Sequence, residues 1–365
     1  MLQSFHILLL RLLSGANLLT VLLLWTAAGS VYLNPQQWPT LALAGLAFPI
    51  FAVINACFIP VWLLLSRIRL WIPIVGFACC FGTLYTYCPV NIPSPHPKGS
   101  IKVVSYNTMG FGHYLADEKD QNVIAKYLKE SNADIICVQE GGGSDRTFRN
   151  KILNLLPHLP YHHRMPVGHE GNMMACISRY PILKTEQITY KSNANGSVAY
   201  LLKLADKDTL VVVNNHLESN HLSQSDRDRY KSLIKRPEDT PVKKSSTLLA
   251  RKIRNAGRSR GSQVDSVAAY IDRQLAMGRS VILCGDFNDT PISYARHRLS
   301  QRLTDTYTAT ANGPGFSFNR DGILVRIDHL MCSGDWQPYS CRVDRSIRAS
   351  DHFPISCYLK RKPRN

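Results

Sequence analysis

Hydrophobic residues dominate the first part of the chain, and the pattern changes near position 98. Residues 12–31 are almost wholly apolar, and further apolar runs extend from about Leu41 to Leu65 and from about Leu70 to Tyr87. At 1.5 Å per residue, a helix of roughly 20 residues crosses a hydrocarbon layer about 30 Å thick. We therefore predict three transmembrane helices within residues 1–90, with the lipid bilayer as the partner of residues 12–87.

Two other interpretations of the apolar runs fit the sequence less well. Buried core helices would be shorter and would show polar faces. A cleavable signal peptide could explain the first run alone, because residues 26–28 are small, as cleavage sites require. The two later runs favour a membrane anchor. Pro49 and Pro60 lie inside the second run, where a membrane helix tolerates them better than a soluble one.

Charge is divided between the two parts of the chain. Residues 1–98 contain no Asp or Glu and four basic residues, Arg11, Arg67, Arg69 and Lys98. The loop near Tyr32–Trp38 has no Lys or Arg, so the positive-inside rule places the N-terminus in the cytoplasm. The sequence thus predicts a multi-pass integral membrane protein with an extracytoplasmic C-terminal domain.

The segment 91–100 reads NIPSPHPKGS, which is typical of an extended spacer rather than a packed element. From Ile101 onward, short β-rich runs alternate with helical patterns such as Gln121–Ser131 and Gln263–Met277. The runs are IKVVSYN, DIICVQE, MMACISRYPI, LVVVNNHL, SVILCGDFN, RIDHLMC and HFPISCYL. This alternation predicts one α/β (or α+β) domain over residues 101–360.

Most of these strand-like runs have a carboxylate, amide or imidazole side chain at or beside one end. They are Asn107, Glu140, His216, Asp286 with Asn288, Asp328, and Asp351 with His352. A turn or capping role would explain any one of them. Strand ends meet at one edge of a sheet, however, so we expect these metal-binding and acid–base side chains to share a cleft.

The order SYN, QE, NNHLES, GDFND, RIDH and SDHFPI resembles the endonuclease/exonuclease/phosphatase superfamily over roughly residues 101–360. GDFN followed by SDH is specific in combination and weak when either stands alone. The resemblance implies a four-layer sandwich, in which two packed β-sheets are flanked by helices. It also implies a hydrolase of phosphodiester or phosphomonoester bonds.

The resemblance assigns a metal site to three residues. Glu140 is similar to the family's principal metal ligand, Asn107 supports it from the first strand, and Asp351 can approach the metal. Hard oxygen ligands suit Mg²⁺ or Mn²⁺. Some family members carry a further aspartate two residues after the asparagine, where this chain has Met109. A single labile Mg²⁺ therefore fits better than two tightly held ions.

The resemblance also assigns catalytic roles. His352 corresponds to the general base that activates water, and Asp328 to the carboxylate that orients its ring. Asp286 and Asn288 position the nucleophile and bind a phosphate oxygen, and His216 donates a hydrogen bond or a proton to the phosphate.

Asn172 and Arg179, in GNMMACISRYPI, are the candidates for substrate binding through phosphate contacts. For Arg179, a capping or surface role explains the residue equally well. A phosphate-containing substrate is therefore expected, whether nucleic acid, phospholipid or phosphorylated small molecule, and the sequence does not choose among them because selectivity lies in loops. No protein partner is indicated.

Net charge and cysteines add two points. The formal charge of +17 suits anionic partners. Residues 227–260 carry twelve Lys or Arg against three acidic residues, and form either a solvated insertion or an electrostatic collar for a polyanion or a membrane surface. Ten cysteines, several inside apolar runs and none in a C-x-x-C pair, argue against disulfides and structural zinc.

Two functions from different classes remain. The first is a membrane-anchored, Mg²⁺-dependent phosphoester hydrolase. The second is a catalytically inactive family member that acts as a membrane-tethered binding module for anionic ligands. Replacement of Glu140, Asp286, Asp328 or His352 would indicate the inactive state, and all four are present. The sequence favours the hydrolase.

Overall fold

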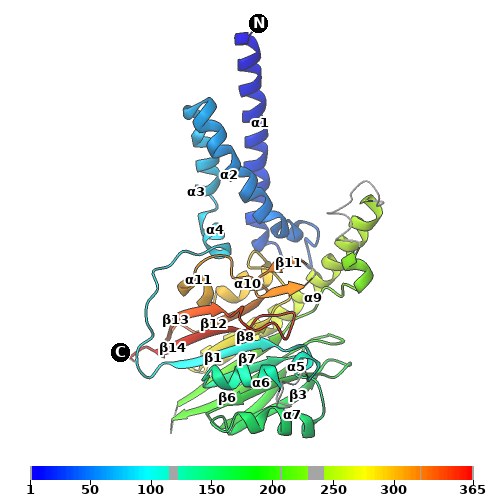
Figure 1. Ribbon diagram of the computed structural model, residues 1–365, viewed down its shortest axis with the longest axis vertical. Helices are drawn as coiled ribbons and strands as arrows, with labels where there is room; N and C mark the ends of the chain where they lie inside the picture. The colour runs from blue at the N-terminus through cyan, green and yellow to red at the C-terminus, as the bar shows by residue number, and fades with distance from the viewer. Residues whose placement is uncertain (1, 115–121, 206–207, 229–241, 321, 364–365) are drawn as a thin grey trace.

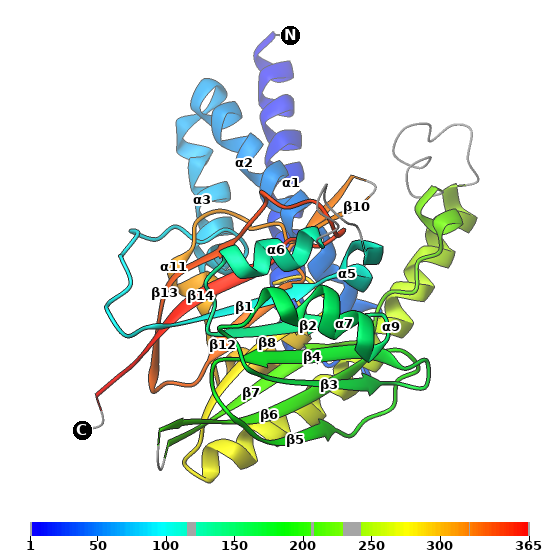
Figure 2. The ribbon, with the colours of Figure 1, turned by 60° about the horizontal axis from the view of Figure 1, so that its bottom comes forward.

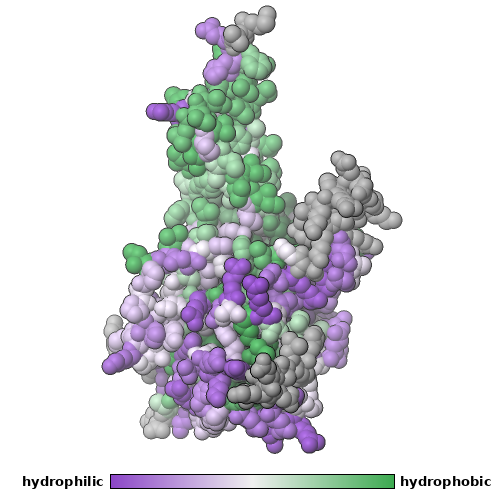
Figure 3. All heavy atoms as spheres, viewed as in Figure 1, coloured by the Kyte–Doolittle hydropathy of each residue, from purple (hydrophilic) through white to green (hydrophobic). Residues whose placement is uncertain are grey.

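A computed structural model describes residues 2–114, 122–205, 208–228, 242–320 and 322–363. It has two parts, a set of apolar N-terminal helices and a layered α/β domain (Figure 1). The N-terminus lies at the end of α1 that is far from the domain. Apolar residues cover the helices, and polar residues cover most of the visible face of the domain (Figure 3).

Two of the N-terminal helical stretches, Gln3–Tyr32 and Leu41–Leu65, are long and apolar enough to cross a membrane. The third predicted helix is broken, since Arg67–Ala78 and Phe81–Tyr87 are bent by 66° and count as a span only together. The helical segments are α1 (Leu2–Gly29), η1 (Ser30–Tyr32), η2 (Leu41–Ala47), α2 (Phe48–Leu65), η3 (Arg67–Leu70), α3 (Trp71–Ala78) and α4 (Phe81–Tyr87).

The break in the third helix has a local cause. The carbonyl oxygen of Gly76 accepts hydrogen bonds from Trp25 Nε1 at 2.9 Å and from the Cys80 thiol at 3.2 Å. The Cys80 backbone N–H bonds to Phe77 instead of Gly76. Side chains that occupy a helical carbonyl in this way interrupt the regular ladder and bend the helix.

The domain contains two six-stranded mixed sheets, ordered β13-β14-β1-β2-β4-β3 and β5-β6-β7-β8-β12-β9, and a small β10-β11 pair. The first sheet has β1 (Ile101–Asn107), β2 (Ile135–Gln139), β3 (Tyr161–Val167), β4 (Asn172–Ser178), β13 (Trp336–Val343) and β14 (Ile355–Arg361). The second has β5 (Ile182–Ile188), β6 (Gly196–Ala205), β7 (Asp208–His216), β8 (Ser280–Asp286), β9 (Thr304–Asp305) and β12 (Asp328–Cys332). The pair is β10 (Phe318–Arg320) and β11 (Ile323–Val325).

Helices cover the outer faces of both sheets (Figure 2). They are α5 (Met109–Tyr114), α6 (Val123–Glu130), α7 (Asp145–Lys151), η4 (Leu153–Leu155), α9 (Val242–Ala276) and α10 (Tyr294–Ser300). α11 (Thr306–Thr310) instead contributes Tyr307 to the core between the sheets. Successive strand side chains point to opposite faces. Val103 and Val212 therefore enter the core between the sheets, whereas Val104 packs under α6 and Val211 under α9. The predicted four-layer sandwich is confirmed.

The two predicted helices both form, and the cysteines are unpaired. The predicted helix Gln121–Ser131 forms as α6, which Asn122 caps by accepting from Ala125 N. The predicted helix Gln263–Met277 is the end of the longer α9, so part of the basic segment 227–260 is helical and residues 229–241 lie outside the described residues. All ten cysteines are free.

The N-terminal helices pack directly on the domain. Buried Arg326 donates to Thr86 O at 2.6 Å and to Pro314 O at 2.6 Å. Gly45 of η2 lies so close to the domain that an added Cβ would stand 2.2 Å from Ile292 O. Such contacts fix the helices on one side of the sandwich.

The Pro-rich segment 91–100 has no regular structure and is mostly exposed, as expected of a spacer, and it touches the domain at a few places. The ring of His96 stacks on Tyr358 with centroids 3.7 Å apart. Asn91 Nδ2 donates to Ala311 O at 2.6 Å. An extended proline-rich chain suits these contacts because it exposes its side chains and carbonyls to a neighbouring surface.

Candidate active site

Three polar side chains form a row across the end of the second sheet. In register, His216 at the end of β7 lies beside Asp286 at the end of β8, and Asp286 lies beside Asp328 at the start of β12. Partners in register carry their side chains on the same face. All three are buried, so the sheet delivers two carboxylates and an imidazole to one place.

Asn107 joins this row to the first sheet. It ends β1, and its Nδ2 donates to Glu140 Oε1 at 3.1 Å and to Asp286 Oδ2 at 3.2 Å. Glu140 directly follows β2, the parallel neighbour of β1. The ends of both sheets therefore meet at this amide.

His352 completes the group from the loop before β14. Its Nδ1 lies 2.9 Å from Asp328 Oδ2, and its Nε2 lies 3.6 Å from Asp286 Oδ2. A carboxylate at Nδ1 fixes the proton on that nitrogen and leaves Nε2 for chemistry. We call Asn107, Glu140, His216, Asp286, Asp328 and His352 the site cluster.

His216 faces the cluster with one nitrogen. Its Nε2 lies 3.6 Å from both Glu140 Oε1 and Asp286 Oδ2, and its Nδ1 lies 3.4 Å from Asn172 Nδ2. An amide nitrogen can only donate, so Nδ1 accepts and the neutral ring carries its hydrogen on Nε2. His216 is therefore a donor directed into the site.

Residues that the sequence analysis missed hold this geometry. Ser317 Oγ accepts from Asp328 N at 3.0 Å, and the Phe318 ring lies edge-on to His352 with centroids 5.0 Å apart. Ser350 Oγ donates to Asn107 O at 2.8 Å and accepts from His352 N at 3.2 Å. Ser317 stands in a context without a distinctive sequence signal, and Ser350 belongs to the SDH motif, which assigned it no role, so only the fold shows these contacts.

The backbone around the cluster is strained. Met109, Glu140 and Asn288 have φ values of 45°, 51° and 52°, a left-handed region that is uncommon for residues other than glycine. Asn288 is held there by its N–H, which donates to Asp286 Oδ1 at 2.7 Å, and by Nδ2, which donates to Leu217 O at 2.9 Å. Strain of this kind concentrates at functional sites.

Burial and charge shift two pKa values in opposing ways. Burial raises the pKa of Asp286, although His352 partly offsets it. Burial alone would lower the pKa of His352, but attraction to Asp328 and Asp286 outweighs burial and raises it to about 10. A ring with that pKa is protonated at neutral pH. It can act as a base only when positive charge elsewhere offsets the carboxylates.

Two predicted site residues, Arg179 and Asp351, form ion pairs outside the site cluster. Arg179 does not join the cluster: it pairs with Asp134 at 2.7 Å, beyond the opposite end of β2, because β4 runs antiparallel to β2 and places its last residue beside Ile135. Asp351 lies near the cluster, but its carboxylate pairs with Arg320 at 2.9 Å.

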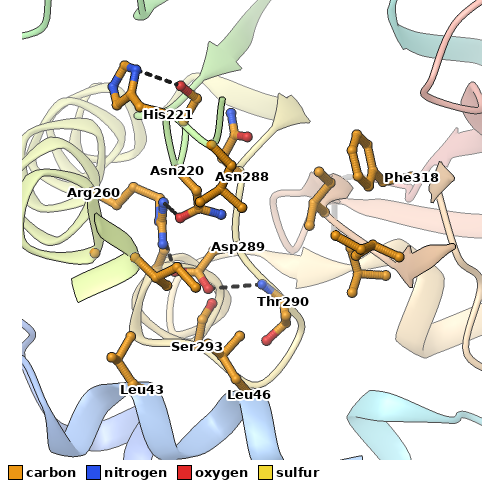
Figure 4. Close-up of a pocket in the computed structure, with 18 of the residues that line it drawn as sticks. Leu43, Leu46, Asn220, His221, Arg260, Asn288, Asp289, Thr290, Ser293 and Phe318 are labelled. Atoms are coloured by element: carbon orange, nitrogen blue, oxygen red, sulfur yellow. Dashed lines mark hydrogen bonds and ion pairs between the residues drawn. The ribbon is translucent and has the colours of Figure 1, made fainter. Parts of the chain in front are cut away.

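A cavity of about 540 Å³ opens beside the cluster (Figure 4). Glu140, Asn288, Asp351 and His352 line the end beside the site cluster. Leu43 and Leu46 of η2 form part of the opposite side. The N-terminal helices therefore contribute to the wall of the site.

Comparison with known families identifies the domain. The family model of the Endonuclease/Exonuclease/phosphatase family matches residues 104–352. The chain belongs to this family. A second family model, of a domain of unknown function, matches residues 10–87, and none of the curated proteins matches the chain by sequence.

One solved structure matches the fold with a TM-score above 0.5, and others match less closely. The chain is similar to the human Nocturnin catalytic domain with bound sulfate, at a TM-score of 0.51 and 16% identity, covering 74% of this chain and 96% of that one. It is also similar to ANGEL2, a 2′,3′-cyclic phosphatase, at a TM-score of 0.48 and 14% identity, covering 71% and 95%. An endonuclease/exonuclease/phosphatase family protein from Bacteroides thetaiotaomicron gives a TM-score of 0.45 and 19% identity, covering 72% of this chain and 98% of that one.

The site cluster fits the divalent metal typical of this family. Asp286, Asp328 and His352 each offer a ligand atom, and these atoms lie within 4.8 Å of one another. Among the described residues, no hydrogen-bond donor reaches the buried Asp328 Oδ1. This concentration of buried carboxylates, with Glu140 and the amide of Asn107 beside it, suits a hard divalent cation such as Mg²⁺ or Mn²⁺.

Proposed function

We propose that this protein is a metal-dependent phosphoester hydrolase held at a membrane by its N-terminal helices. The His352–Asp328 pair carries the proposal. An oriented imidazole with one nitrogen bonded to a buried carboxylate and the other facing a cavity is the arrangement of a general base. The family supports a phosphoester as the bond that is cleaved.

In this mechanism His352 Nε2 takes a proton from the attacking water, and Asp328 stabilises the imidazolium that forms. The water oxygen forms a bond to phosphorus, and the bond from phosphorus to the leaving oxygen breaks. Asp286, 3.6 Å from Nε2, orients the water. His216 donates from Nε2 to a phosphate oxygen, as its tautomer allows, and Asn288 contacts the phosphate.

Glu140 and Asn107 would hold the metal, with Asp351 close by, which leaves Asp286 to orient the water and the His352–Asp328 pair to move the proton. When bound, the ion polarises a phosphoryl oxygen and stabilises the leaving oxygen. Binding through Asn107 needs its amide oxygen, which in this structure accepts from Met109 N at 3.2 Å. Glu140 is the more direct ligand, because its side chain is 36% exposed and reaches the cavity.

The test uses the purified full chain in detergent with bis-p-nitrophenyl phosphate, with Mg²⁺, Mn²⁺ or EDTA. A screen of DNA, RNA, sphingomyelin and inositol phosphates follows. We expect hydrolysis that depends on the metal. Binding of anionic ligands without turnover of any ester would instead support the alternative, an inactive binding module.

The membrane arrangement is a separate proposal. The N-terminus and η3, which contains Arg67 and Arg69, lie at the end of the helices away from the domain (Figure 1). The positive-inside rule would put that end in the cytoplasm and the domain outside. Protease added to intact cells should then digest residues 100–365, and protection of that region would reverse the orientation.

The basic segment 227–260 is a further candidate for anion binding. Arg251 and Arg258 are exposed on α9, whereas Lys252 pairs with buried Asp226; Lys243 and Lys244 have no described side chains. α9 extends beside the base of the N-terminal helices (Figure 1). Replacement of Arg251 and Arg258 by Gln should weaken polyanion binding and flatten its dependence on salt concentration. Hydrolysis of a small diester is the control and should not change.

A further inference from the structure

The cavity beside the site cluster changes character along its length. Its catalytic end is lined by polar residues, including Asn288, Asp351 and His352. Away from that end the wall carries aliphatic and aromatic side chains from four elements of the chain, interspersed with polar residues such as Asn220, His221 and Arg260. The apolar side chains are Leu43 and Leu46 of η2, Leu249 and Ile253 of α9, and Phe318, Ile323 and Val325 of β10 and β11.

The leucines of η2 give the cavity its position relative to a membrane. They belong to the stretch Leu41–Leu65, which is apolar and long enough to span a bilayer. η2 is the part of that stretch that lies against the domain, as the close approach of Gly45 to Ile292 shows. Tyr32, whose ring contacts His297 of the domain, and Trp38, whose carbonyl accepts from Ala42 N of η2, are 71% and 54% exposed. Such aromatic residues favour the membrane–water interface. The apolar side of the cavity thus lies at the candidate membrane boundary.

We infer that the cavity binds the apolar chain of a lipid whose phosphoester is cleaved at the catalytic end. This inference rests on the proposed function and names its substrate class. A volume of about 540 Å³ falls within the usual range of ligand pockets, roughly 300–1,000 Å³. Aliphatic walls suit alkyl chains, since burial of each methylene contributes up to about fourfold in affinity.

A nucleic acid fits this lining less well. Recognition of single strands relies on aromatic platforms and on cations that contact phosphates. Most apolar side chains of the lining are aliphatic and offer no stacking surface, and the Phe318 ring already packs edge-on to His352. Of the three arginines in the lining, Arg320 pairs with Asp351 and Arg260 with Asp289, whereas Arg227 donates to Leu222 O and to Gln224. Two of the three cations are therefore already compensated by carboxylates.

The test uses alkyl p-nitrophenyl phosphate diesters, with alkyl groups from methyl to dodecyl, below their micelle concentrations. The cleaved bond is the same in every member, so only the chain contacts vary. The full-length protein in detergent should show a KM that falls with chain length. In the variant Leu43→Asn with Leu46→Asn, the ratio of the methyl KM to the dodecyl KM should fall by roughly tenfold or more.

Two variants sharpen the result. Leu43→Trp fills part of the cavity, so KM should stop falling at a shorter alkyl chain than in the wild type. Leu183→Asn, at a 54% exposed position on β5, is the matched control and should keep the wild-type ratio. Because the measured quantity is a ratio, a general loss of active protein cancels.

The outcomes separate this inference from the function it rests on. Hydrolysis of the methyl ester with no dependence on chain length would overturn the inference and leave the hydrolase standing. A chain-length dependence that survives in the leucine variants would also overturn it, as would inhibition of methyl ester hydrolysis by an oligonucleotide but not by a dodecyl phosphate. Absence of hydrolysis of every ester, with Mg²⁺ or Mn²⁺ present, would instead refute the proposed function.

Discussion

Two buried groups of polar side chains, one among the N-terminal helices and one at the sheet ends, are built on opposite principles. In the first, Asn17 Nδ2 donates to Asn55 Oδ1 at 3.0 Å, Trp62 Nε1 donates to Asn17 Oδ1 at 2.8 Å, and Asn55 Nδ2 donates to Pro73 O at 3.1 Å. These residues are neutral and bond to one another. The group is closed, and it ties α1, α2 and α3 together.

The site cluster is open. Its carboxylates crowd together, Asp328 Oδ1 meets no donor among the described residues, and Glu140 and Asn288 have left-handed backbones. A buried polar network that is only partly satisfied is costly, and it persists where a ligand completes it. The comparison teaches that satisfaction of hydrogen bonds, more than polarity, distinguishes a functional cluster from a structural one.

Glu140→Gln should give the largest effect. It keeps the shape of the side chain but removes the charge that would hold the metal. Because a metal supplies several kcal/mol of transition-state stabilisation, kcat should fall by about 10³-fold or more. Hydrolysis of bis-p-nitrophenyl phosphate measures the loss, and thermal unfolding should change little because Glu140 is partly exposed.

Metal removal is the companion experiment. EDTA followed by exhaustive dialysis should abolish hydrolysis by the wild type, and Mg²⁺ or Mn²⁺ should restore it. Glu130→Gln, at an exposed position at the end of α6, is the charge-matched control and should behave as wild type. Full activity in EDTA would refute the metal requirement.

His352→Ala should lower kcat by roughly 10²–10⁴-fold, the usual contribution of a general base, with a smaller change in KM. Asp328→Asn should act in the same direction less severely. If the two residues work as a unit, the double variant should be no slower than His352→Ala alone, since such effects are not additive. Steady-state kinetics of all three variants tests this. If the loss of kcat in the double variant equalled the product of the losses in the two single variants, the two residues would act independently and the pairing would be contradicted.

The comparison also shows which parts of the site the sequence could predict. β1 has the predicted bounds Ile101–Asn107, and the other strand runs end within a few residues of their expected positions. Apolar runs followed by Asn, Glu, Asp or His are a local signal. The resemblance then supplied the fold and the roles of residues such as Asp328 and His352, which the structure brings within hydrogen-bonding distance.

The rest depends on chain direction and on contacts across long separations. Arg179 follows an apolar run like the others, but β4 is antiparallel to β2, so the beginning of β4 meets the site and its end does not. Ser317 acts through a single hydroxyl. Leu43 and Leu46 lie in a run whose composition indicates only a membrane span, and their place in the cavity wall follows from packing.

Asp305→Asn removes the negative charge from a buried ion pair of the domain whose hydrogen bonds are satisfied. Buried Asp305 accepts from Arg296 Nε at 2.9 Å. Removing one partner of a buried pair costs about 3 kcal/mol, so the variant should unfold at a lower urea concentration at pH 7. Hydrolysis by the folded variant should not change, because the pair does not contact the site cluster.

The pH dependence of this pair has a definite sign. Burial alone would raise the pKa of Asp305, but Arg296, with help from His329, outweighs burial and holds it below the ordinary 3.8. The pair's contribution is present above pH 3.8 and is lost as the pH falls through the lower folded value. The stability gap between wild type and Asp305→Asn should therefore narrow below pH 3.8. If the difference in stability between the two proteins stayed constant below pH 3.8, the charge of Asp305 would not be its cause.

Asn17→Leu should give the smallest effect, because hydrogen bonds between helices in an apolar medium contribute about 1 kcal/mol. The substitution leaves Asn55 Oδ1 without its donor and Trp62 Nε1 without its acceptor, so the helices should separate more readily in a denaturing-detergent titration. Asn17→Leu with Asn55→Leu should cost less than the sum of the single changes, because removing both partners leaves fewer unsatisfied groups. Hydrolysis of the methyl ester should persist in both variants. If Asn17→Leu abolished that hydrolysis while the helices stayed associated, the closed group would serve function as well as structure, and the distinction between closed and open clusters would fail.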